Sequence, residues 1–215
     1  VDISEKDEEE EIYLSQIVPS RIFNLTQLEN NPKFKNLGTL IININSGLSN
    51  YQNLSENLQK IGLKTQIFEI KNGENFIKSL KNKETDLPLD KKFKILILVV
   101  PDNTQYSLND CLTFFDSLFI IFQSMNIPEL DKIVIISPED YFGWEQGANS
   151  LSSGIGAFIK TINREFQIPI KLINSINLEH IIQEILTWDQ IEEVAYKDNI
   201  RYTLLRKKLE NIPEI

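Results

Sequence analysis

Cysteine, histidine and methionine each occur only once among the 215 residues of this sequence. The single Cys111 excludes an internal disulfide and a zinc site built from several cysteines. The single His180 leaves little room for histidine-based catalysis. We expect both to be structural, because Cys111 lies among apolar helical residues and no acid–nucleophile pair is close to His180.

Long hydrophobic runs and basic patches are also missing. The longest apolar run, residues 95–101, falls far short of the ~18 residues that a membrane helix needs. The first eleven residues carry seven acidic side chains, which argues against a signal peptide. The net charge is −9 and no basic stripe is present, so neither membrane nor nucleic acid is an expected partner. We expect a cytoplasmic protein in which residues 1–10 form an acidic tail or linker.

What is present is the composition of a globular domain, with 41% hydrophobic and 25% charged residues. Strand-length apolar runs alternate about five times with helical segments, and several runs are apolar enough to be buried on both faces. The expected strands are 11–18, 39–45, 64–70, 93–100, 131–137 and 168–173, and the expected helices are 49–61, 73–80, 107–123, 150–166 and 177–186. The pattern predicts an α/β fold: a truncated Rossmann-like, mostly parallel sheet with helices on both faces.

The two ends of the chain do not fit this alternation. An N-terminal strand at 11–18 and a C-terminal hairpin around Lys197-Asp198-Asn199 are expected as additions at a sheet edge, or as surfaces that pair with a missing piece. We place the domain at residues 11–210 and expect 211–215 to link it to a following domain.

A nucleotide-binding loop is not evident. The turn after strand 39–45 has the single Gly47, whereas a dinucleotide site needs G-x-G-x-x-G there. Glu69, which could bind a ribose, is expected to be an exposed strand residue. The one G-x-G, at Gly154 and Gly156, could cradle a phosphate, but close packing of a helix on a strand is the favoured interpretation. Glu139-Asp140 could bind a metal, although a solvated acid pair is favoured.

Residues 131–174 have the rhythm of the catalytic half of short-chain dehydrogenases, in which a strand ends in Ser and the next helix carries Tyr-x-x-x-Lys. Ser137 could take the serine position, but Ser150 and Gly154 stand near the tyrosine and lysine positions. No tyrosine in the chain has lysine four residues further on. Because this chemistry needs a phenol that donates a proton, we expect no catalytic residue here. We also expect no metal ligand, since the acid pair Glu139-Asp140 is interpreted as solvated.

Four segments in the same order resemble the structural, non-catalytic subdomain of modular polyketide synthase ketoreductases. They are Ile12–Pro19, Gly38–Ile42 with Gly47-Leu48, the G-x-x-x-K-T helix Gly156–Glu165, and the hairpin Glu193–Tyr202 with its Arg201-Tyr202 pair. The usual Trp of the first segment is absent, and Asn199 and Ile200 stand where the hairpin turn commonly has Gly.

This resemblance implies a degenerate reductase copy that binds no cofactor and braces a catalytic subdomain, expected in the same polypeptide. That partner would use NADPH to reduce β-ketoacyl thioesters on an acyl carrier protein, which this chain would meet only indirectly. The alternatives are a free-standing interaction module and an active reductase with an atypical NADPH site. Residues at both ends, apolar or aromatic except for Arg201, form the expected docking edge: Ile12, Leu14, Ile17, Tyr196, Arg201, Tyr202 and Leu204.

Overall fold

The computed structural model describes residues 13–19, 35–44, 51–70, 93–100, 108–124, 129–137, 150–189 and 191–208. The expected helix at 73–80 lies outside these residues. The strands are β1 (Tyr13–Pro19), β2 (Gly38–Ile44), β3 (Lys64–Ile70), β4 (Ile95–Val99), β5 (Lys132–Ser137), β6 (Ile170–Asn174), β7 (Glu193–Lys197) and β8 (Ile200–Lys208). The helices are α1 (Tyr51–Lys60), α3 (Leu108–Ser124), α4 (Ser150–Phe166) and α5 (Leu178–Leu186).

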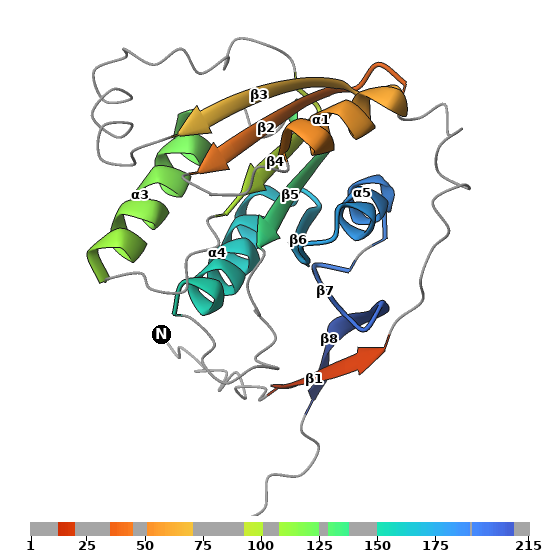
Figure 1. Ribbon diagram of the computed structural model, residues 1–215. Coiled ribbons are helices and arrows are strands. Elements are labelled where there is room, and N and C mark those ends of the chain that lie inside the picture. The colour runs from red at the N-terminus through yellow and green to blue at the C-terminus, as the bar shows by residue number, and fades with distance from the viewer. Residues whose placement is uncertain are drawn as a thin grey trace, which may run out of the picture.

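The described strands form one sheet in the order β1-β8-β7-β6-β5-β4-β2-β3 (Figure 1). All pairs from β3 to β7 are parallel, whereas β8 runs antiparallel to β7 and β1 antiparallel to β8. The mostly parallel, Rossmann-like sheet expected from the sequence is therefore confirmed. The first and last described strands pair with each other at one edge, with Tyr13 opposite Lys208.

The C-terminal hairpin departs from expectation in one respect. We expected both of its strands outside the parallel series, but β7 pairs in parallel with β6, with Leu172 opposite Glu193. Helix α5 connects these two strands, so β6, α5 and β7 make one more βαβ unit. The prediction was wrong because the apolar part of β7 is very short and its partner β8 gives a strong hairpin signal. Only β8 and β1 are antiparallel additions to the described parallel sheet.

Two helical layers cover the sheet (Figure 1). Apolar residues of α1 and α5, such as Leu58 and Ile185, pack on one face with Ile97 and Val134. Residues of α3 and α4 pack on the other face with Leu96 and Ile135. Every residue of β4 is buried, which explains its uninterrupted apolar sequence.

Gly154 brings α4 close to α3. A Cβ atom at this position would lie 2.5 Å from Cζ of Phe115, well inside normal contact distance. Phe115 in turn packs against Phe114 and Phe158. The Gly154 position is therefore explained by close packing, as the favoured interpretation held, but the neighbour is a helix and not a strand.

Two turns contain residues with positive φ angles, which explains their residue types. Gly62 has φ +101° directly after α1, a conformation that glycine adopts without strain. Asp198 and Asn199 join β7 to β8 with φ of 51° and 61°, as a type I′ hairpin turn requires. Asn tolerates this left-handed region better than most residues, which accounts for Asn199 where the resembling hairpins have Gly.

Candidate functional site

Ligands of open parallel sheets usually bind where the strand order reverses, at the carboxyl ends of the strands. Here the reversal lies between β2 and β4, which end at Ile44 and Val99. The segments that follow these strands, 45–50 and 101–107, lie outside the described residues, as do 71–92 and 138–149. The expectations for Gly47 and for Glu139-Asp140 fall in them.

Four other residues that were considered as functional candidates from the sequence lie within the described residues. Ser137 ends β5 and is 1% exposed, and its carbonyl accepts a hydrogen bond from Asn174 Nδ2 at 3.3 Å. Ser150 begins α4, on a different element from Ser137. Cys111 belongs to α3, as expected, and Glu69 is an exposed residue of β3. These placements do not bring a nucleophile and a proton donor together.

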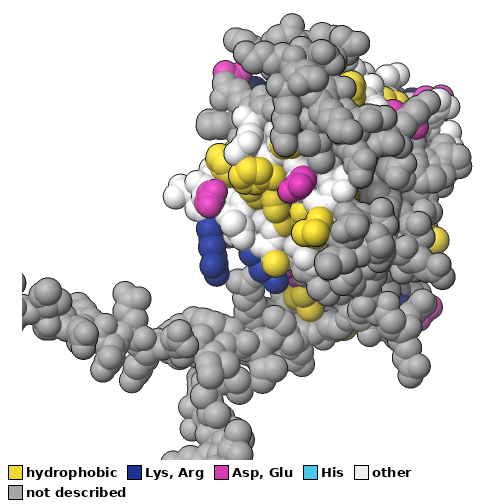
Figure 2. Space-filling model, turned by 90° about the vertical axis from the view of Figure 1, so that its left-hand side faces the viewer, with side chains coloured by type: hydrophobic (Ala, Val, Ile, Leu, Met, Phe, Trp, Pro, Cys, Tyr) yellow, Lys and Arg dark blue, Asp and Glu magenta, His cyan; other side chains and the backbone are white. Residues whose placement is uncertain are grey.

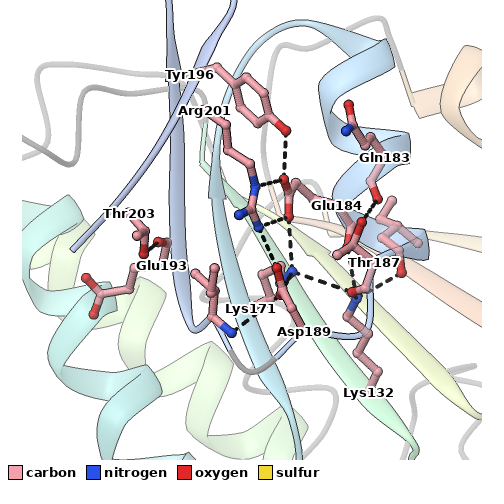
Figure 3. A network of polar contacts seen from close by, with 12 residues as sticks. Lys132, Lys171, Gln183, Glu184, Thr187, Asp189, Glu193, Tyr196, Arg201 and Thr203 are labelled. Carbon is pink, nitrogen blue, oxygen red and sulfur yellow. Dashed lines mark hydrogen bonds and ion pairs between the residues drawn. The ribbon is translucent and has the colours of Figure 1, made fainter. Parts of the chain in front are cut away.

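The outstanding polar feature of the described residues is a buried ionic network between α5 and the β5–β8 end of the sheet (Figure 3). At its centre, the carboxylate of Glu184 is fully buried on α5. Arg201 of β8 grips it with two parallel hydrogen bonds, Nε to Oε1 at 2.5 Å and Nη2 to Oε2 at 2.9 Å. This bidentate arrangement is the strongest form of carboxylate recognition available to a side chain.

Two more residues complete the ionic cluster. Lys171, the second residue of β6, lies 3.0 Å from Glu184 Oε2 and also pairs with Asp189 Oδ1. Asp189, in the segment between α5 and β7, accepts a second hydrogen bond from Arg201 Nη2 at 2.8 Å. Each buried cation therefore meets both carboxylates, so the charges of β6, α5 and β8 are neutralised within the chain.

Lys132 closes the C-terminal end of α5. Its Nζ donates to the carbonyls of Glu184, Ile185 and Thr187 at 2.9, 2.9 and 2.7 Å. These carbonyls lie in or just beyond the last turn of α5, where helix carbonyls lack partners within the helix. A lysine ammonium has three hydrogens, and here each has an acceptor. Lys132 therefore caps α5 from the first residue of β5.

The electrostatics of the cluster follow from this geometry. Burial alone would raise the pKa of Glu184, but the hydrogen bond from Arg201 and the charge of Lys171 lower that pKa to about 2. Burial acts to lower the pKa of Arg201, and the bonds to Glu184 outweigh it and raise that pKa. Burial, followed by repulsion from Lys171, lowers the pKa of Lys132.

Tyr196 and His180 form the outer wall of the network. The Tyr196 hydroxyl donates to Glu184 Oε1 at 2.7 Å, and burial together with the Glu184 charge raises the pKa of this phenol. The ring of His180 stacks on that of Tyr196 with centroids 3.9 Å apart. Burial lowers the pKa of His180. His180 thus occupies a packed position, in keeping with the structural role expected for it.

A second ion pair ties the same end of the sheet to the opposite helical layer. Lys160 Nζ of α4 lies 2.9 Å from Glu193 Oε1 at the start of β7. Next to it, Asn163 Nδ2 donates to Glu192 Oε1. The lysine of the G-x-x-x-K segment and the acid that begins the closing hairpin are therefore direct neighbours. Two of the four segments that carry the family resemblance meet at this point.

A cavity of about 440 Å³ lies beside the network, at the amino ends of β5 and β6. Lys132, Lys171 and Asp189 form part of its wall, together with Trp188 and Glu192. The ammonium groups of both lysines are already bonded to carbonyls or carboxylates of the chain. The two lysines beside the cavity therefore serve the ionic network, which holds α5, β6 and β8 together.

The residues of the expected docking edge fall into different places. Ile12 lies outside the described residues, and Leu14 and Ile17 belong to the edge strand β1. Tyr202 and Leu204 are half-buried on β8, opposite Pro19 and Ile17 of β1.

Arg201 requires a correction. Its side chain is 1% exposed and is directed into the ionic network, so it does not line the outer surface of the edge. Tyr196 is also engaged with Glu184. The guanidinium of Arg201 finds its counter-charge in the buried Glu184, so it points into the domain and not towards a partner surface.

The network itself was missed at the sequence level, although two signals were present. Lys171 interrupts an otherwise apolar strand that is buried on both faces, and such a charge requires a buried counter-charge. Glu184 lies on α5 three residues after the buried Ile181, on the side of the helix that faces the sheet. Together they indicate an ion pair between β6 and α5.

Neither a membrane-spanning helix nor a metal cluster is found among the described residues. None of their helices is long and apolar enough to cross a membrane. In the same part of the chain, no three His, Cys, Asp or Glu side chains gather closely enough to hold a metal ion.

Comparison with known proteins relates the fold to ketoreductases. No protein-family model and no curated protein sequence matches the chain. Among solved structures, an A1-type ketoreductase superposes with a TM-score of 0.58 at 8% identity, over 94% of this chain and 43% of that one. A-type ketoreductases from a modular polyketide synthase give 0.57 at 8% identity, with the same two shares.

A third solved structure is a keto acid-selecting NRPS module with adenylation, ketoreductase and pseudo Asub domains. It gives a TM-score of 0.57 at 12% identity, over 92% of this chain and 18% of that one. The chain therefore spans less than half the length of each of these three proteins. At these identities the likeness shows the fold: a reductase-like α/β domain of the kind found in ketoreductases.

Proposed function

We propose that this chain is a non-catalytic structural domain that braces the catalytic half of a polyketide synthase ketoreductase. The observation that carries the proposal is the ionic network of Glu184, Arg201, Lys171 and Asp189. It places the most buried charges of the described residues at a junction between elements, where they hold β8, and through it β1, against the domain. A structural domain needs such a junction if it is to hold the β1–β8 edge in a fixed position for its partner.

The sequence supports the non-catalytic part of the proposal. The chain has no Tyr-x-x-x-Lys pair, and Ser137 is buried at the end of β5. Its first βα turn has one glycine, Gly47, in place of a phosphate-binding loop. In this proposal NADPH is bound by the catalytic half, which also receives the substrate from an acyl carrier protein.

The bracing surface is proposed to be the edge made by β1 and β8. Its strands join antiparallel over seven residue pairs, from Tyr13–Lys208 to Pro19–Tyr202. Of the two, β1 is the edge strand, and an edge strand offers backbone groups to a partner, as in recognition by strand addition. On β8, the half-buried side chains Tyr202 and Leu204 lie opposite β1, and Thr203 between them is also half-buried.

The first test is the sequence that surrounds this chain in its parent gene. A following domain with a glycine-rich loop and a Tyr-x-x-x-Lys pair is expected. A gene without any reductase-like sequence would contradict the proposal. The same sequence tests the first alternative, because an interaction module needs no reductase neighbour. The second alternative is tested by titration, because an active reductase would bind NADPH by itself.

The second test measures association of the chain with that catalytic half supplied in trans, by calorimetry or surface plasmon resonance. Tyr202→Asp should weaken association at least about tenfold, because it places a charge in a partly buried edge. Tyr202→Phe is the matched control and should bind like the parent chain. The circular dichroism spectrum should show that the core of both variants stays folded. Equal binding by Tyr202→Asp and the parent chain would remove the β1–β8 edge from the proposal.

A further inference from the structure

The cavity beside the ionic network has the size of a small-molecule site. Its volume is about 440 Å³, and ligand pockets usually enclose ~300–1,000 Å³. Lys132 and Ile170, the first residues of β5 and β6, lie in its wall, so it is formed at the amino ends of these strands. Ligands of open parallel sheets usually bind at the opposite, carboxyl ends. The cavity is therefore separate from the place where a reductase would bind its cofactor.

The two lysines in the wall have no hydrogen left for a ligand. The Lys132 ammonium donates to three carbonyls at the end of α5. The Lys171 ammonium also has three acceptors, which belong to Glu184, Asp189 and Thr187 (Figure 3). An ammonium group carries three hydrogens, so the chain itself saturates both groups. An anionic ligand would find two positive charges here but no hydrogen-bond donor on either.

Unused acceptors come from the end of α4 and from the residue before β7. Asn163 Nδ2 donates to Glu192 Oε1, so this contact engages one polar atom of each side chain. The amide oxygen of Asn163 and the second oxygen of Glu192 have no partner among the described residues. Gln167 is exposed, and its side-chain amide makes no hydrogen bond within the described part of the chain. All three side chains line the cavity and offer oxygens to a ligand that donates hydrogen bonds.

The end of α4 adds negative charge to these acceptors. Helix α4 ends at Phe166, and the backbone N–H of Gln167 donates to the carbonyl of Asn163 at 3.0 Å. The last carbonyls of a helix carry a partial negative charge, equivalent to about half an electron. Arg164, the basic residue of the last turn, does not line the cavity. The charged side chains of the network and the cavity wall balance each other, so the helix end favours a cation: Lys132, Lys171 and Arg201 against Glu184, Asp189 and Glu192.

The remaining wall is apolar and aromatic, with Trp188 and Ile191 among its residues. The Trp188 ring already lies beside one cation, with Lys132 Nζ 5.5 Å from its centroid. From this geometry we infer that the cavity binds a small organic cation, whose guanidinium or ammonium group meets Glu192 and Asn163 and whose short alkyl stem packs on the apolar wall. The inference goes beyond the proposed function and does not depend on it, because this chain alone forms the cavity.

The experiment titrates the full chain with agmatine, a short alkyl chain with a guanidinium at one end and an ammonium at the other, by isothermal calorimetry. The parent chain should bind one agmatine with a dissociation constant below about 1 mM. Glutarate, a dicarboxylate, is the opposite-charge probe and should give no heat of binding. Glu192→Gln should weaken agmatine binding at least about tenfold, because it removes the charge and keeps an oxygen that accepts from Asn163.

Gln167 offers a second pair of variants, at an exposed position where folding is not at risk. Gln167→Glu should tighten agmatine binding at least about threefold, and Gln167→Lys should weaken it by at least the same factor, because each changes the charge beside the ligand. The opposite signs of these two effects are specific to a cation in the cavity. If Glu192→Gln does not fold, the Gln167 pair decides the question.

Asp116→Asn is the charge control, because it removes one acid from an exposed position of α3 that does not line the cavity. Asp116 lies between Leu112, which is 55% exposed, and Phe119, which is 53% exposed. Figure 2 shows the side of the molecule on which α3 lies in Figure 1, where acidic side chains stand among hydrophobic ones. Asp116→Asn should bind agmatine within about twofold of the parent chain.

Three results would overturn the inference. The first is a parent chain that gives no heat with agmatine at about 10 mM, and the second is binding of glutarate in its place. The third is unchanged agmatine binding in Glu192→Gln and in both Gln167 variants. The cation would then lie elsewhere, for example on the seven acidic side chains of the first eleven residues. Agmatine should also raise the melting temperature of the parent chain more than that of Glu192→Gln.

Discussion

Glu184 and Arg201 form a bidentate ion pair in which neither side chain is more than 1% exposed. Glu184 comes from α5 and Arg201 from β8, and the two are seventeen positions apart in the chain. The pair therefore fixes an antiparallel strand at the end of the sheet to a helix that covers the sheet.

The first prediction concerns removal of the central carboxylate. Glu184→Gln leaves Arg201 and Lys171 buried beside one carboxylate, that of Asp189, and should lower the free energy of unfolding by about 3–5 kcal/mol. Urea unfolding followed by circular dichroism would measure it. Glu179→Gln, an exposed change on the same helix, is the control and should stay within about 0.5 kcal/mol of the parent. A loss below about 1 kcal/mol for Glu184→Gln would show that the network contributes little.

The second prediction concerns pH. The pKa of Glu184 is about 2 in the folded chain, against an ordinary value of 4.5. A carboxyl with a lowered folded pKa stabilises fully above its unfolded pKa, and this contribution disappears as the pH falls through the folded pKa.

We therefore expect the stability difference between the parent chain and Glu184→Gln to be constant down to about pH 5 and to shrink by about 3 kcal/mol towards pH 2. Protonated Glu and Gln are both neutral, so the two proteins should become alike there. Comparing the variants removes the contribution of the other carboxyls. A difference that stays constant down to pH 2 would contradict the assigned pKa of Glu184.

The third prediction concerns the contact between α3 and α4. Gly154→Ala should raise helix propensity, but its new methyl group would lie 2.5 Å from Phe115 Cζ. We expect a net destabilisation of about 1–3 kcal/mol from overpacking. In a Phe115→Leu background the ring is absent, and Gly154→Ala should then be neutral or stabilising by up to about 1 kcal/mol. Thermal unfolding of the four proteins tests this, and equal effects in both backgrounds would exclude the clash.

The fourth prediction concerns the cofactor. The first βα turn has Gly47 alone, so isothermal titration of the chain with NADPH should give no measurable heat of binding. An active ketoreductase titrated in the same buffer is the positive control. Micromolar affinity for NADPH would favour the alternative of an active reductase with an atypical site.

The sequence was most informative where burial leaves a regular pattern of apolar residues. Strand β4 and helix α4 could be placed because a fully buried strand is continuously apolar and because an amphipathic helix repeats its apolar residues. Gly62 and Asp198-Asn199 could be identified because their backbone conformations favour few residue types. These features depend on local chemistry, which a single sequence records directly.

The features that were missed depend on partners far away in the chain. Lys171 and Glu184 are separate polar residues in the sequence, and only the packing of α5 on β6 makes them a pair. The parallel pairing of β7 with β6 could not be predicted for the same reason. The sequence around β7 reveals its antiparallel partner β8, whereas its parallel partner β6 lies on the far side of α5 in the chain. The exposure of Leu112 and Phe119 on α3 could not be predicted for a similar reason, since both resemble core residues until α4 and the sheet are placed around the helix.

The pairing of β1 with β8 also has a mechanical consequence. Tyr13 lies opposite Lys208, so the chain enters and leaves the sheet at the same end of this ladder. Tension applied between these two residues would open the ladder one pair at a time, as a zip opens, and would not shear all its hydrogen bonds at once. The opening would travel towards the pair Pro19–Tyr202 and there meet Arg201, held by Glu184. Under load, β1 should separate from β8 first, while the ion pair between Arg201 and Glu184 keeps β8 attached to the parallel sheet.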